Sequence, residues 1–488
     1  MSGEQLLLLL PIILVTATTV LTMLMVAAKR SHAVSCAITA LGLTLSLLSL
    51  FIVIPLAPQE VTPLLRVDGF SLFFTSLILL SGLAITLFSY PYLSNLEDHQ
   101  DEFYLLLTIA VLGALVMVSS THFVTAFLGM ETLSVSLYGM IAYPLHRRET
   151  AQYPMEASIK YLVLSAVSSG FFLFGVALLY AQTGTLHFSS IASALAGMEG
   201  SVPPAYYVVA TLLIITGFAF KLSLVPFHLW TPDVYEGAPL PATAFLATVG
   251  KLAMAALLMR FISVSGVLSS ESIVHVLSIM AVFSIIAGNL LALLQSNLKR
   301  LLSYSSIAHM GYLLIALLTL NALDGNLGAE AVSFYLVAYV LMSLGAFGVM
   351  MAVSDSAQER DHIGHYQGLF WRNPWLALVF TAMLLSLAGI PLTAGFIGKF
   401  YIFAAGVQGA QWGLLFAMII GSAIGLFYYL RIIYRMLTPL EEYEPMPEAG
   451  LKELLPHCVL FVLLCALIVF GVYPNGLMSL LETVVATL

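Results

Sequence analysis

The sequence predicts an all-α polytopic membrane protein of about fourteen transmembrane helices. Hydrophobic residues make up 60% of its 488 residues and charged residues only 9%, whereas soluble domains carry about 25% charged residues. Apolar windows long enough to span a bilayer as a helix recur along the whole chain. They lie near 5–28, 33–57, 70–93, 103–120, 122–143, 155–182, 205–230, 240–264, 271–294, 300–321, 330–353, 375–406, 411–437 and 453–473.

Basic residues predict how these windows are oriented. Lys29 and Arg30 follow the first window, and because Lys and Arg favour the cytoplasmic side, the amino terminus is expected outside. Ser119 to His122 form the short boundary between the fourth and fifth windows. Arg66 is an exception to the rule for basic residues, because alternation places it on the outside. Alternation places these residues on the cytoplasmic side: Arg147–Arg148, Lys299–Arg300, Arg360, Arg372, Arg435 and Lys452.

Four lysines fit no loop: Lys160, Lys221, Lys251 and Lys399. A lysine at the centre of a bilayer costs roughly 3 kcal/mol on insertion scales, so a buried lysine is a candidate functional residue. The alternative is that the side chain reaches the interface. That alternative suits Lys160, about two turns from its cytoplasmic end, and suits Lys221 and Lys399 poorly.

An internal repeat surrounds two of these lysines. The motif G-F-x-x-K occurs at Gly217–Lys221 and again at Gly395–Lys399, 178 residues later (399 minus 221). The motifs lie in the seventh and twelfth windows, and because a repeat of five helices is odd in number, the two five-helix units, helices 4–8 and 9–13, are expected to have inverted topology. The predicted domains are residues 1–100 with three helices, the repeats 103–265 and 271–437, and a last helix and tail at 453–488. The same offset relates Glu131 to His309.

A proline accompanies the lysine in each repeat. Pro226 cannot donate to the carbonyl of Leu222, and Pro391 cannot donate to that of Leu387. Freed carbonyls within a membrane need water or polar partners, so both prolines predict helix breaks at which a proton path can form. Ordinary kinks are the alternative.

Glu131 and His309 are the other titratable residues within the predicted spans. Glu131 has no charged neighbour in "FLGMETLSVSLYGM", so a cation from another helix is its expected companion. A static ion pair that holds helices together is the alternative. His309, in "SYSSIAHMGY", suits a proton relay, although a neutral hydrogen-bonded histidine in the core explains it as well.

A possible proton uptake site follows Lys221. His228 precedes "WTPDVYEGAPLPA", which is interpreted as a turn-rich loop with Asp233 and Glu236. A merely solvated loop is an equal alternative. His362 and His365 in "DHIGH" resemble metal ligands in spacing, but without further ligands a loop is the better interpretation.

Other chemistry is not indicated. The three cysteines lie in apolar stretches and suggest neither a disulfide framework nor a metal site. We find no P-loop, dinucleotide fingerprint or cysteine cluster for an iron–sulfur centre, and no cleavable signal peptide is evident. Any redox chemistry is therefore expected on another chain.

At these residues the sequence resembles the antiporter-like membrane subunits of NADH–quinone oxidoreductase, complex I. The resemblance covers nearly the whole chain and is carried by "GMETLSVSLYGM", "FAFKLSLVPFHLWTPDVYEGAP", Gly250–Lys251, "LLSYSSIAHMGY" and "GIPLTAGFIGKFYIF". It implies a proton channel formed by Glu131, Lys221, Lys251 and Lys399, and Lys160 matches the family's lysine on the sixth helix.

Among the three such subunits, the resemblance favours subunit N. The largest continues past its fourteenth helix into a long lateral helix, which is not expected here because the sequence runs only about fifteen residues past that helix. The middle one has glutamate at the position of Lys399. Neighbouring antiporter-like and small membrane subunits and lipids are then the partners, with no nucleic acid. NADH, flavin (FMN), iron–sulfur clusters and quinone belong to other subunits, and this chain holds no cofactor and no metal. A bacterial cell inner membrane with a periplasmic amino terminus is the expected location.

Two alternatives remain at this stage. Multisubunit cation/proton antiporters share the ancestry of this family. A solute-coupled secondary transporter would have a substrate pocket between the repeats, and we find a line of titratable groups instead of a substrate-binding cluster.

Overall fold

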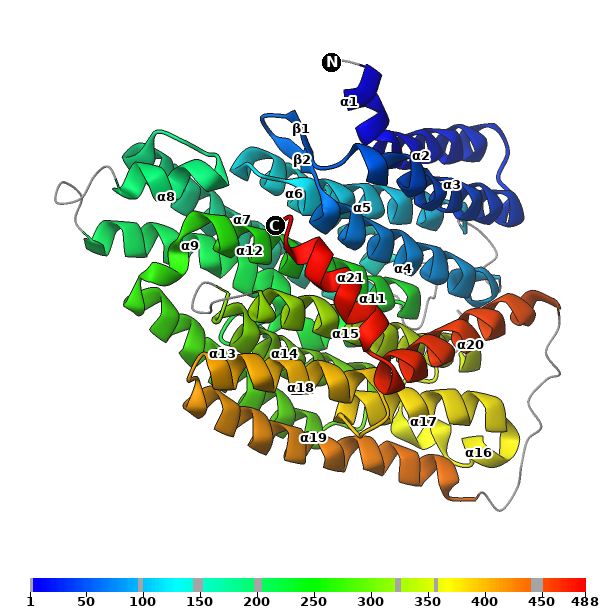
Figure 1. Cartoon of the computed structure of the whole chain (residues 1–488). Coiled ribbons are helices and arrows are strands. Elements are labelled where there is room, and N and C mark those ends of the chain that lie inside the picture. Colours follow the sequence, from blue (N-terminus) through cyan, green and yellow to red (C-terminus); the bar gives the residue numbers. More distant parts are fainter. Residues whose placement is uncertain are drawn as a thin grey trace.

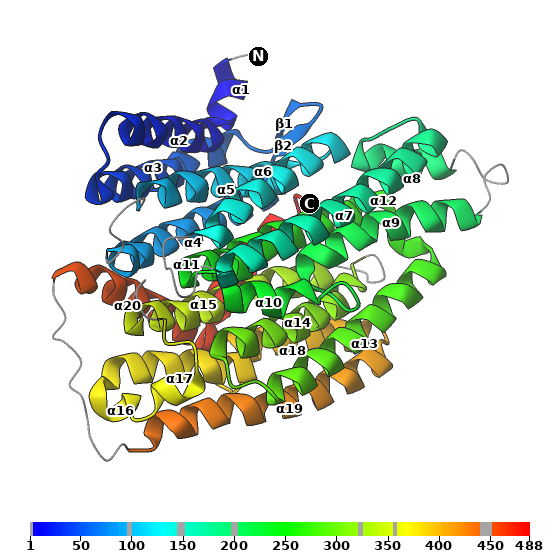
Figure 2. The same ribbon diagram turned by 180° about the vertical axis from the view of Figure 1, so that it is seen from behind.

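The computed structural model is an elongated bundle of long helices (Figures 1 and 2). It describes residues 3–94, 100–143, 152–196, 204–320, 326–354, 359–439 and 451–488. Arg147 and Arg148 lie outside these ranges, and the side chain of Lys452 is not described. Twelve of the described helices are long and apolar enough to cross a membrane, so the chain is a multi-pass membrane protein. The two other predicted spans correspond to α14, which carries charged residues at its start, and to the pair α17 and α18.

The amino-terminal segment packs along one side of the bundle. A two-stranded antiparallel sheet connects α3 to α4, and sequence analysis did not predict it. Asp68 accepts a hydrogen bond from the Ser71 amide, and the Ser71 hydroxyl accepts one from the Asp68 amide, which is a capping box that begins α4. The elements are α1 Gly3–Leu8, α2 Leu10–Ala28, α3 His32–Val53, β1 Gln59–Thr62, β2 Leu65–Val67 and α4 Gly69–Leu93.

The first repeat occupies the cyan and green part of Figure 1. Its seventh predicted span, residues 205–230, is not one helix: α9 ends at Leu222 and α10 begins at Trp230, with Pro226 between them. The predicted loop after Trp230 is wrong, because this segment forms the helix α10. The elements are α5 Asp101–Ser119, α6 Phe123–Ala142, α7 Gln152–Thr183, α8 Phe188–Ala196, α9 Pro204–Leu222, α10 Trp230–Gly237, α11 Leu240–Phe245, a π-helical turn Leu246–Gly250 and α12 Lys251–Ser265.

The second repeat, yellow-green to orange in Figure 1, is broken at the corresponding place. The helix α17 ends at Ala388, Gly389 follows with a φ of 87°, and α18 begins at Ala394, beyond Pro391. A positive φ at the end of a helix favours glycine. The elements are α13 Glu271–Leu293, α14 Leu298–Leu317, α15 Leu327–Val353, α16 Leu369–Arg372, α17 Pro374–Ala388, α18 Ala394–Gln408 and α19 Trp412–Leu437.

Matching backbone hydrogen bonds mark the start of the second helix in each repeat. The Phe123 amide donates to the Leu186 carbonyl, and the Leu298 amide donates to the Asp361 carbonyl. The two donor residues are 175 positions apart (298 minus 123), and the two acceptor residues are also 175 positions apart (361 minus 186). An offset of 175 aligns Glu131 with Ser306 and Ser134 with His309. The offset of 178 predicted that Glu131 aligns with His309, so the two alignments differ by three residues. The inverted relation of the two repeats stays a prediction.

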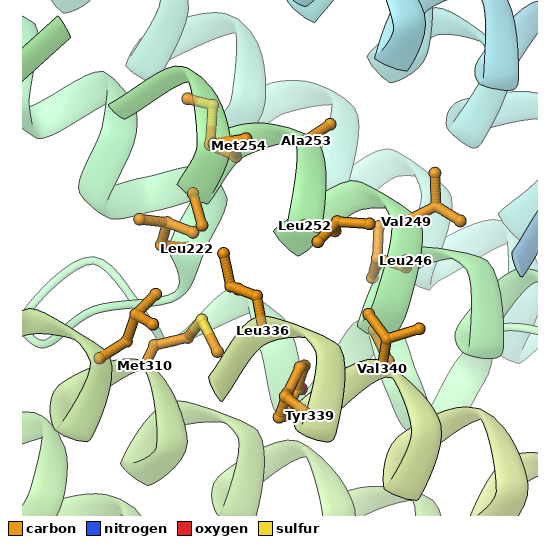
Figure 3. Packing of buried hydrophobic residues seen from close by; sticks show 14 of the residues in the cluster. Leu222, Leu246, Val249, Leu252, Ala253, Met254, Met310, Leu336, Tyr339 and Val340 are labelled. Atoms are coloured by element: carbon orange, nitrogen blue, oxygen red, sulfur yellow. The ribbon is translucent and has the colours of Figure 1, made fainter. Parts of the chain in front are cut away.

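The two repeats meet in a core that is apolar apart from a few polar side chains. Figure 3 shows Leu222 of α9, Met310 of α14 and Leu336 of α15 in this core, all buried, with the polar residue Tyr339 beside them. The carboxyl-terminal helices α20 Leu451–Val472 and α21 Asn475–Val485 complete the bundle. The red helix α21, which was predicted only as a tail, packs on α15 and α4 (Figure 1).

Candidate functional site

Lys221 lies in the last turn of α9, directly before the break, and is 8% exposed. Its ammonium donates to the hydroxyls of Ser134 on α6 at 2.5 Å and Ser165 on α7 at 2.7 Å. The Tyr161 ring lies 5.4 Å from the same nitrogen. The negative end of the α9 dipole also favours a cation at this position. Lys221 is therefore buried in the bundle and does not extend to an interface.

Glu131 lies one helical turn from this lysine site. Its carboxylate accepts a hydrogen bond of 2.5 Å from Ser169 on α7, one turn beyond Ser165. The expected cation is not in direct contact, because no salt bridge joins Glu131 to any other residue in the described ranges. Ser134, one turn from Glu131 on α6, and Ser165, one turn before Ser169 on α7, are the residues that bind Lys221. Serine hydroxyls therefore separate the carboxylate from the ammonium.

Lys251, 1% exposed, begins α12 directly after the π-helical turn. Such turns are frequent at functional sites. Its ammonium donates at 2.5 Å to the Ser306 hydroxyl on α14, and Ser306 in turn shares a hydrogen bond with the Tyr339 hydroxyl on α15. Lys251 belongs to the first repeat and Ser306 to the second, so this bond crosses between them.

Lys399, 8% exposed, lies on α18 beyond the second break. Its ammonium donates to the carbonyls of Leu387 at 3.1 Å and Ala388 at 2.9 Å, at the end of α17. The Leu387 carbonyl is the one that Pro391 leaves without a helical donor. Like Lys221, Lys399 thus places its charge at the carboxyl-terminal end of a half-helix.

A small internal cavity lies between Lys251 and Lys399, with room for about one water molecule. The hydroxyl-bearing residues Ser305, Ser306 and Tyr339 line it, and so does Leu387. Ser306 binds Lys251 and Leu387 binds Lys399, so one cavity borders a partner of each lysine. A polar cavity of this size suits an ordered water.

His309 lies on α14 among tyrosines. One ring nitrogen, Nδ1, is 2.5 Å from the Tyr335 hydroxyl, and Nε2 is 3.3 Å from the Tyr429 hydroxyl. Both the relay and the neutral-core interpretations of this histidine are compatible with these contacts.

Charged residues gather at the predicted cytoplasmic end of the first repeat. Asp233 accepts from Lys160 at 2.9 Å and from Arg300 at 2.8 Å, and Arg300 also donates to Glu236. Burial raises the pKa of the Asp233 carboxyl, but the hydrogen bonds and charges of Lys160 and Arg300 outweigh burial and hold the pKa below its usual value. Lys160 is 41% exposed, as expected for a side chain near the interface.

A second ion pair at this end escaped sequence analysis. Lys299 is 1% exposed and donates at 2.6 Å to Glu359 and at 2.9 Å to the Ala238 carbonyl. Glu359 also accepts from the Leu240 amide at 2.9 Å and from Tyr92. Burial raises the pKa of Glu359, but the Lys299 charge and these hydrogen bonds lower it below its usual value. The polar stretch around Glu359 resembles any solvated loop, so the sequence carries no signal for this pair.

The remaining candidate residues are three histidines: His362, His365 and His228. His362 and His365 cap the short helix Ile363–Tyr366, since each Nδ1 accepts a backbone amide. Within the described residues no group of three metal-ligating side chains occurs. His228 is 8% exposed, lies in the break before α10, and has no hydrogen-bond partner for Nδ1 among described residues.

The fold and site together define a class of protein: a membrane bundle in which Lys221, Lys251 and Lys399 are buried without a carboxylate partner among the described residues, two of them at helix breaks and all held by hydroxyls or carbonyls. Comparison with known proteins agrees with this class. Residues 120–425 match the family model of the transmembrane region of NADH:quinone oxidoreductase and Mrp antiporters.

Solved structures agree over nearly the full length. A chain of respiratory complex I from Thermus thermophilus is 32% identical, with a TM-score of 0.82 over 97% of this chain and 99% of that one. A chain of an archaeal membrane-bound sulfane sulfur reductase is 28% identical, with a TM-score of 0.85; the match covers 99% of this chain and 97% of that one. A chain of the Mrp complex from Dietzia sp. shares the fold at 19% identity, with a TM-score of 0.85; the match covers 100% of this chain and 97% of that one.

The chain therefore belongs to the NADH:quinone oxidoreductase/Mrp antiporter membrane family, as an antiporter-like membrane subunit of the complex I type.

Proposed function

We propose that this chain is subunit N of a proton-translocating NADH–quinone oxidoreductase and that its buried lysines carry protons from cytoplasm to periplasm. Lysine rather than glutamate at position 399 supports the choice of subunit. The chain then lies in a bacterial inner membrane with its amino terminus in the periplasm. Partner subunits bind NADH, FMN, the iron–sulfur clusters and quinone, and this chain carries no redox centre.

The polar contacts that surround each buried lysine, and the cavity between the contacts of Lys251 and Lys399, are the observations that support this proposal most. Ser134 and Ser165 hold Lys221, Ser306 holds Lys251, and the cavity is lined both by Ser306 and by Leu387, the residue whose carbonyl binds Lys399. Hydroxyls both accept and donate hydrogen bonds, so they can pass a proton between neighbouring lysines without becoming charged. A path of this kind is costly in a membrane and is not needed for stability.

Glu131 provides the switch in this account. Two unit charges about 6 Å apart at an effective dielectric near 20 interact by roughly 3 kcal/mol. An energy of that size changes a protonation equilibrium about a hundredfold. A shift of α6 relative to α9 that changes the distance from Glu131 to Lys221 therefore changes whether Lys221 holds its proton. Lys160, His228, Asp233 and Glu236 are the candidate residues for uptake at the cytoplasmic end.

The proposal is tested by tagging the chain, purifying its complex and measuring the protons moved per NADH oxidised in proteoliposomes. We expect NADH oxidation and quinone reduction to co-purify with the chain, and the variant Lys251→Ala to lower the ratio while the complex assembles. Purification with cation/proton antiporter subunits and no NADH oxidation would favour the antiporter alternative. An unchanged ratio in Lys251→Ala would remove the lysine path.

A further inference from the structure

Tyr235 on α10 lies between the Lys221 site and the Lys251 site. On one side, Trp230 at the start of α10 packs against Tyr161 with 4.8 Å between ring centroids, and the Tyr161 ring lies 5.4 Å from the Lys221 ammonium. On the other side the Lys251 ammonium lies 5.8 Å from the centre of the Tyr235 ring. Among the described residues, no hydrogen bond joins Lys221 to Lys251 or to Ser306, so proton transfer between the two lysines needs a further group.

The Tyr235 hydroxyl is unusual because it is buried and unpaired. The residue is 0% exposed, and no described residue forms a hydrogen bond of normal geometry with its oxygen, although the Ser306 hydroxyl lies near it. Buried hydroxyls are costly to leave without a partner. Most tyrosines near this site are paired: Tyr335 with His309, Tyr339 with Ser306 and Tyr429 with Ser305.

The neighbours of Tyr235 line the internal cavity. Its ring packs against Phe347 with 6.3 Å between centroids, and its hydroxyl lies near Ser306. Phe347 and Ser306 both line the cavity. A water there would find hydroxyl partners in Ser305, Ser306 and Tyr339, enough polar partners for a buried water, and Ser306 connects this water to the Tyr235 hydroxyl beside it.

We propose that Tyr235 is the relay residue through which a proton passes from Lys221 to Lys251. The proposal rests on the proposed function. In the transfer, the phenol oxygen takes a proton from the Lys221 side as an N–H or water O–H bond breaks. Its own O–H bond breaks and delivers a proton toward Lys251. Tyrosine is neutral before and after, one proton moves, and nothing is oxidised or reduced.

Its place on α10 also connects the relay to the charged residues at the cytoplasmic end. Asp233, two residues before Tyr235, is held by Lys160 and Arg300. The Thr243 hydroxyl donates to the Tyr235 carbonyl at 3.2 Å. A change in these ion pairs therefore displaces the same short helix that carries the relay hydroxyl.

The variant Tyr235→Phe tests the proposal in the whole complex, because it removes the hydroxyl and keeps the ring. We expect proton flux through this chain to fall on the order of 100-fold, as for other positioned proton-transfer groups, so that the ratio of protons to NADH falls to that of Lys251→Ala. The matched control is Tyr366→Phe. Tyr366 is also 0% exposed, but its hydroxyl donates at 2.8 Å to the Arg360 carbonyl in a loop, and this variant should keep the normal ratio.

A second measurement separates a relay from a structural role. Site-specific replacement of Tyr235 by difluorotyrosine keeps the ring and hydroxyl but makes the hydroxyl more acidic. A relay predicts a shifted pH profile of proton pumping, whereas a structural role predicts the wild-type profile. A normal ratio in Tyr235→Phe together with a lowered ratio in Lys251→Ala would overturn this inference and leave the proposed function standing. Normal ratios in both would overturn the proposed function itself.

Discussion

The ammonium of Lys399 donates a 3.1 Å hydrogen bond to the carbonyl of Leu387. Pro391 prevents any helical amide from reaching that carbonyl. The carbonyls at the helix break thus provide hydrogen-bond acceptors for the buried ammonium, and the ammonium provides the donor that these carbonyls lack. The break is therefore part of the lysine site and not only a kink.

Gly389 tests this relationship. It adopts a φ of 87°, and a Cβ added there would lie 2.9 Å from Cδ of Lys399. We expect Gly389→Ala to displace the lysine and to lower the ratio of protons pumped to NADH oxidised. The control is Gly184→Ala, which has a similar φ of 66° and no atom within 4 Å of the new Cβ. Both variants carry the backbone strain of roughly 1–2 kcal/mol, so equal effects on pumping would contradict displacement of Lys399.

Glu131→Gln keeps the shape of the side chain and removes its charge. Because the interaction with Lys221 then disappears, we expect proton pumping to be lost, whereas Glu131→Asp keeps part of it. The measurement is NADH-driven proton uptake into vesicles over a range of pH. Ser169→Ala, which removes only the hydroxyl that binds Glu131, should have a smaller effect. If the glutamine variant pumps like wild type at every pH, Glu131 has a structural role only.

A buried ion pair at the predicted periplasmic end should stabilise the chain in a pH-dependent way. Arg260, 2% exposed, donates to both oxygens of Asp68 at 2.8 and 2.9 Å. Burial raises the pKa of Asp68, but the hydrogen bonds and charge of Arg260 lower it below the usual value. For a lowered folded pKa, the stabilisation is complete above the unfolded value of about 4 and is lost as the pH falls through the folded pKa.

We therefore expect Asp68→Asn to destabilise the complex by about 3 kcal/mol at pH 7, because Arg260 is left buried without its partner. Thermal unfolding of the detergent-solubilised complex at several pH values measures the effect. The difference from wild type should shrink toward low pH. Arg66→Ala is the control, since Arg66 is 33% exposed and lies 3.3 Å from Asp68, and a comparable loss there would argue against the Arg260 pair.

The pair of Lys299 with Glu359 should position α10. Glu359→Gln removes the carboxylate that Lys299 and the Leu240 amide contact. We expect a lower ratio of protons to NADH together with faster hydrogen exchange in residues 230–240, measured by mass spectrometry. Asp361→Asn, which changes a neighbouring carboxylate bound to Asn297, should leave both quantities near wild type. Unchanged exchange in Glu359→Gln would show that this pair does not hold α10.

Sequence analysis found the buried lysines because a lysine within an apolar span is too costly to be accidental. It also found Pro226 and Pro391, which lie at the two breaks. It missed their partners Ser134, Ser165 and Ser306, since serine is common in membrane helices, where it also bonds to its own backbone; Ser134, for example, donates to the Met130 carbonyl.

The helix α10 was predicted as a loop because of its prolines and glycine. Pro232 lies in its first turn, where no intrahelical amide is required. The ion pairs of Asp68 with Arg260 and of Lys299 with Glu359 join residues 192 and 60 positions apart, and no local pattern indicates such a pairing.

The variant Lys221→Ala tests the central claim, that the buried lysines carry the protons, most directly. The measurement is the number of protons moved per NADH oxidised by the assembled complex in proteoliposomes. We expect this ratio to fall strongly with the complex intact, and Lys221→Arg should not restore it, because arginine does not release its proton. A normal ratio in Lys221→Ala would contradict the account.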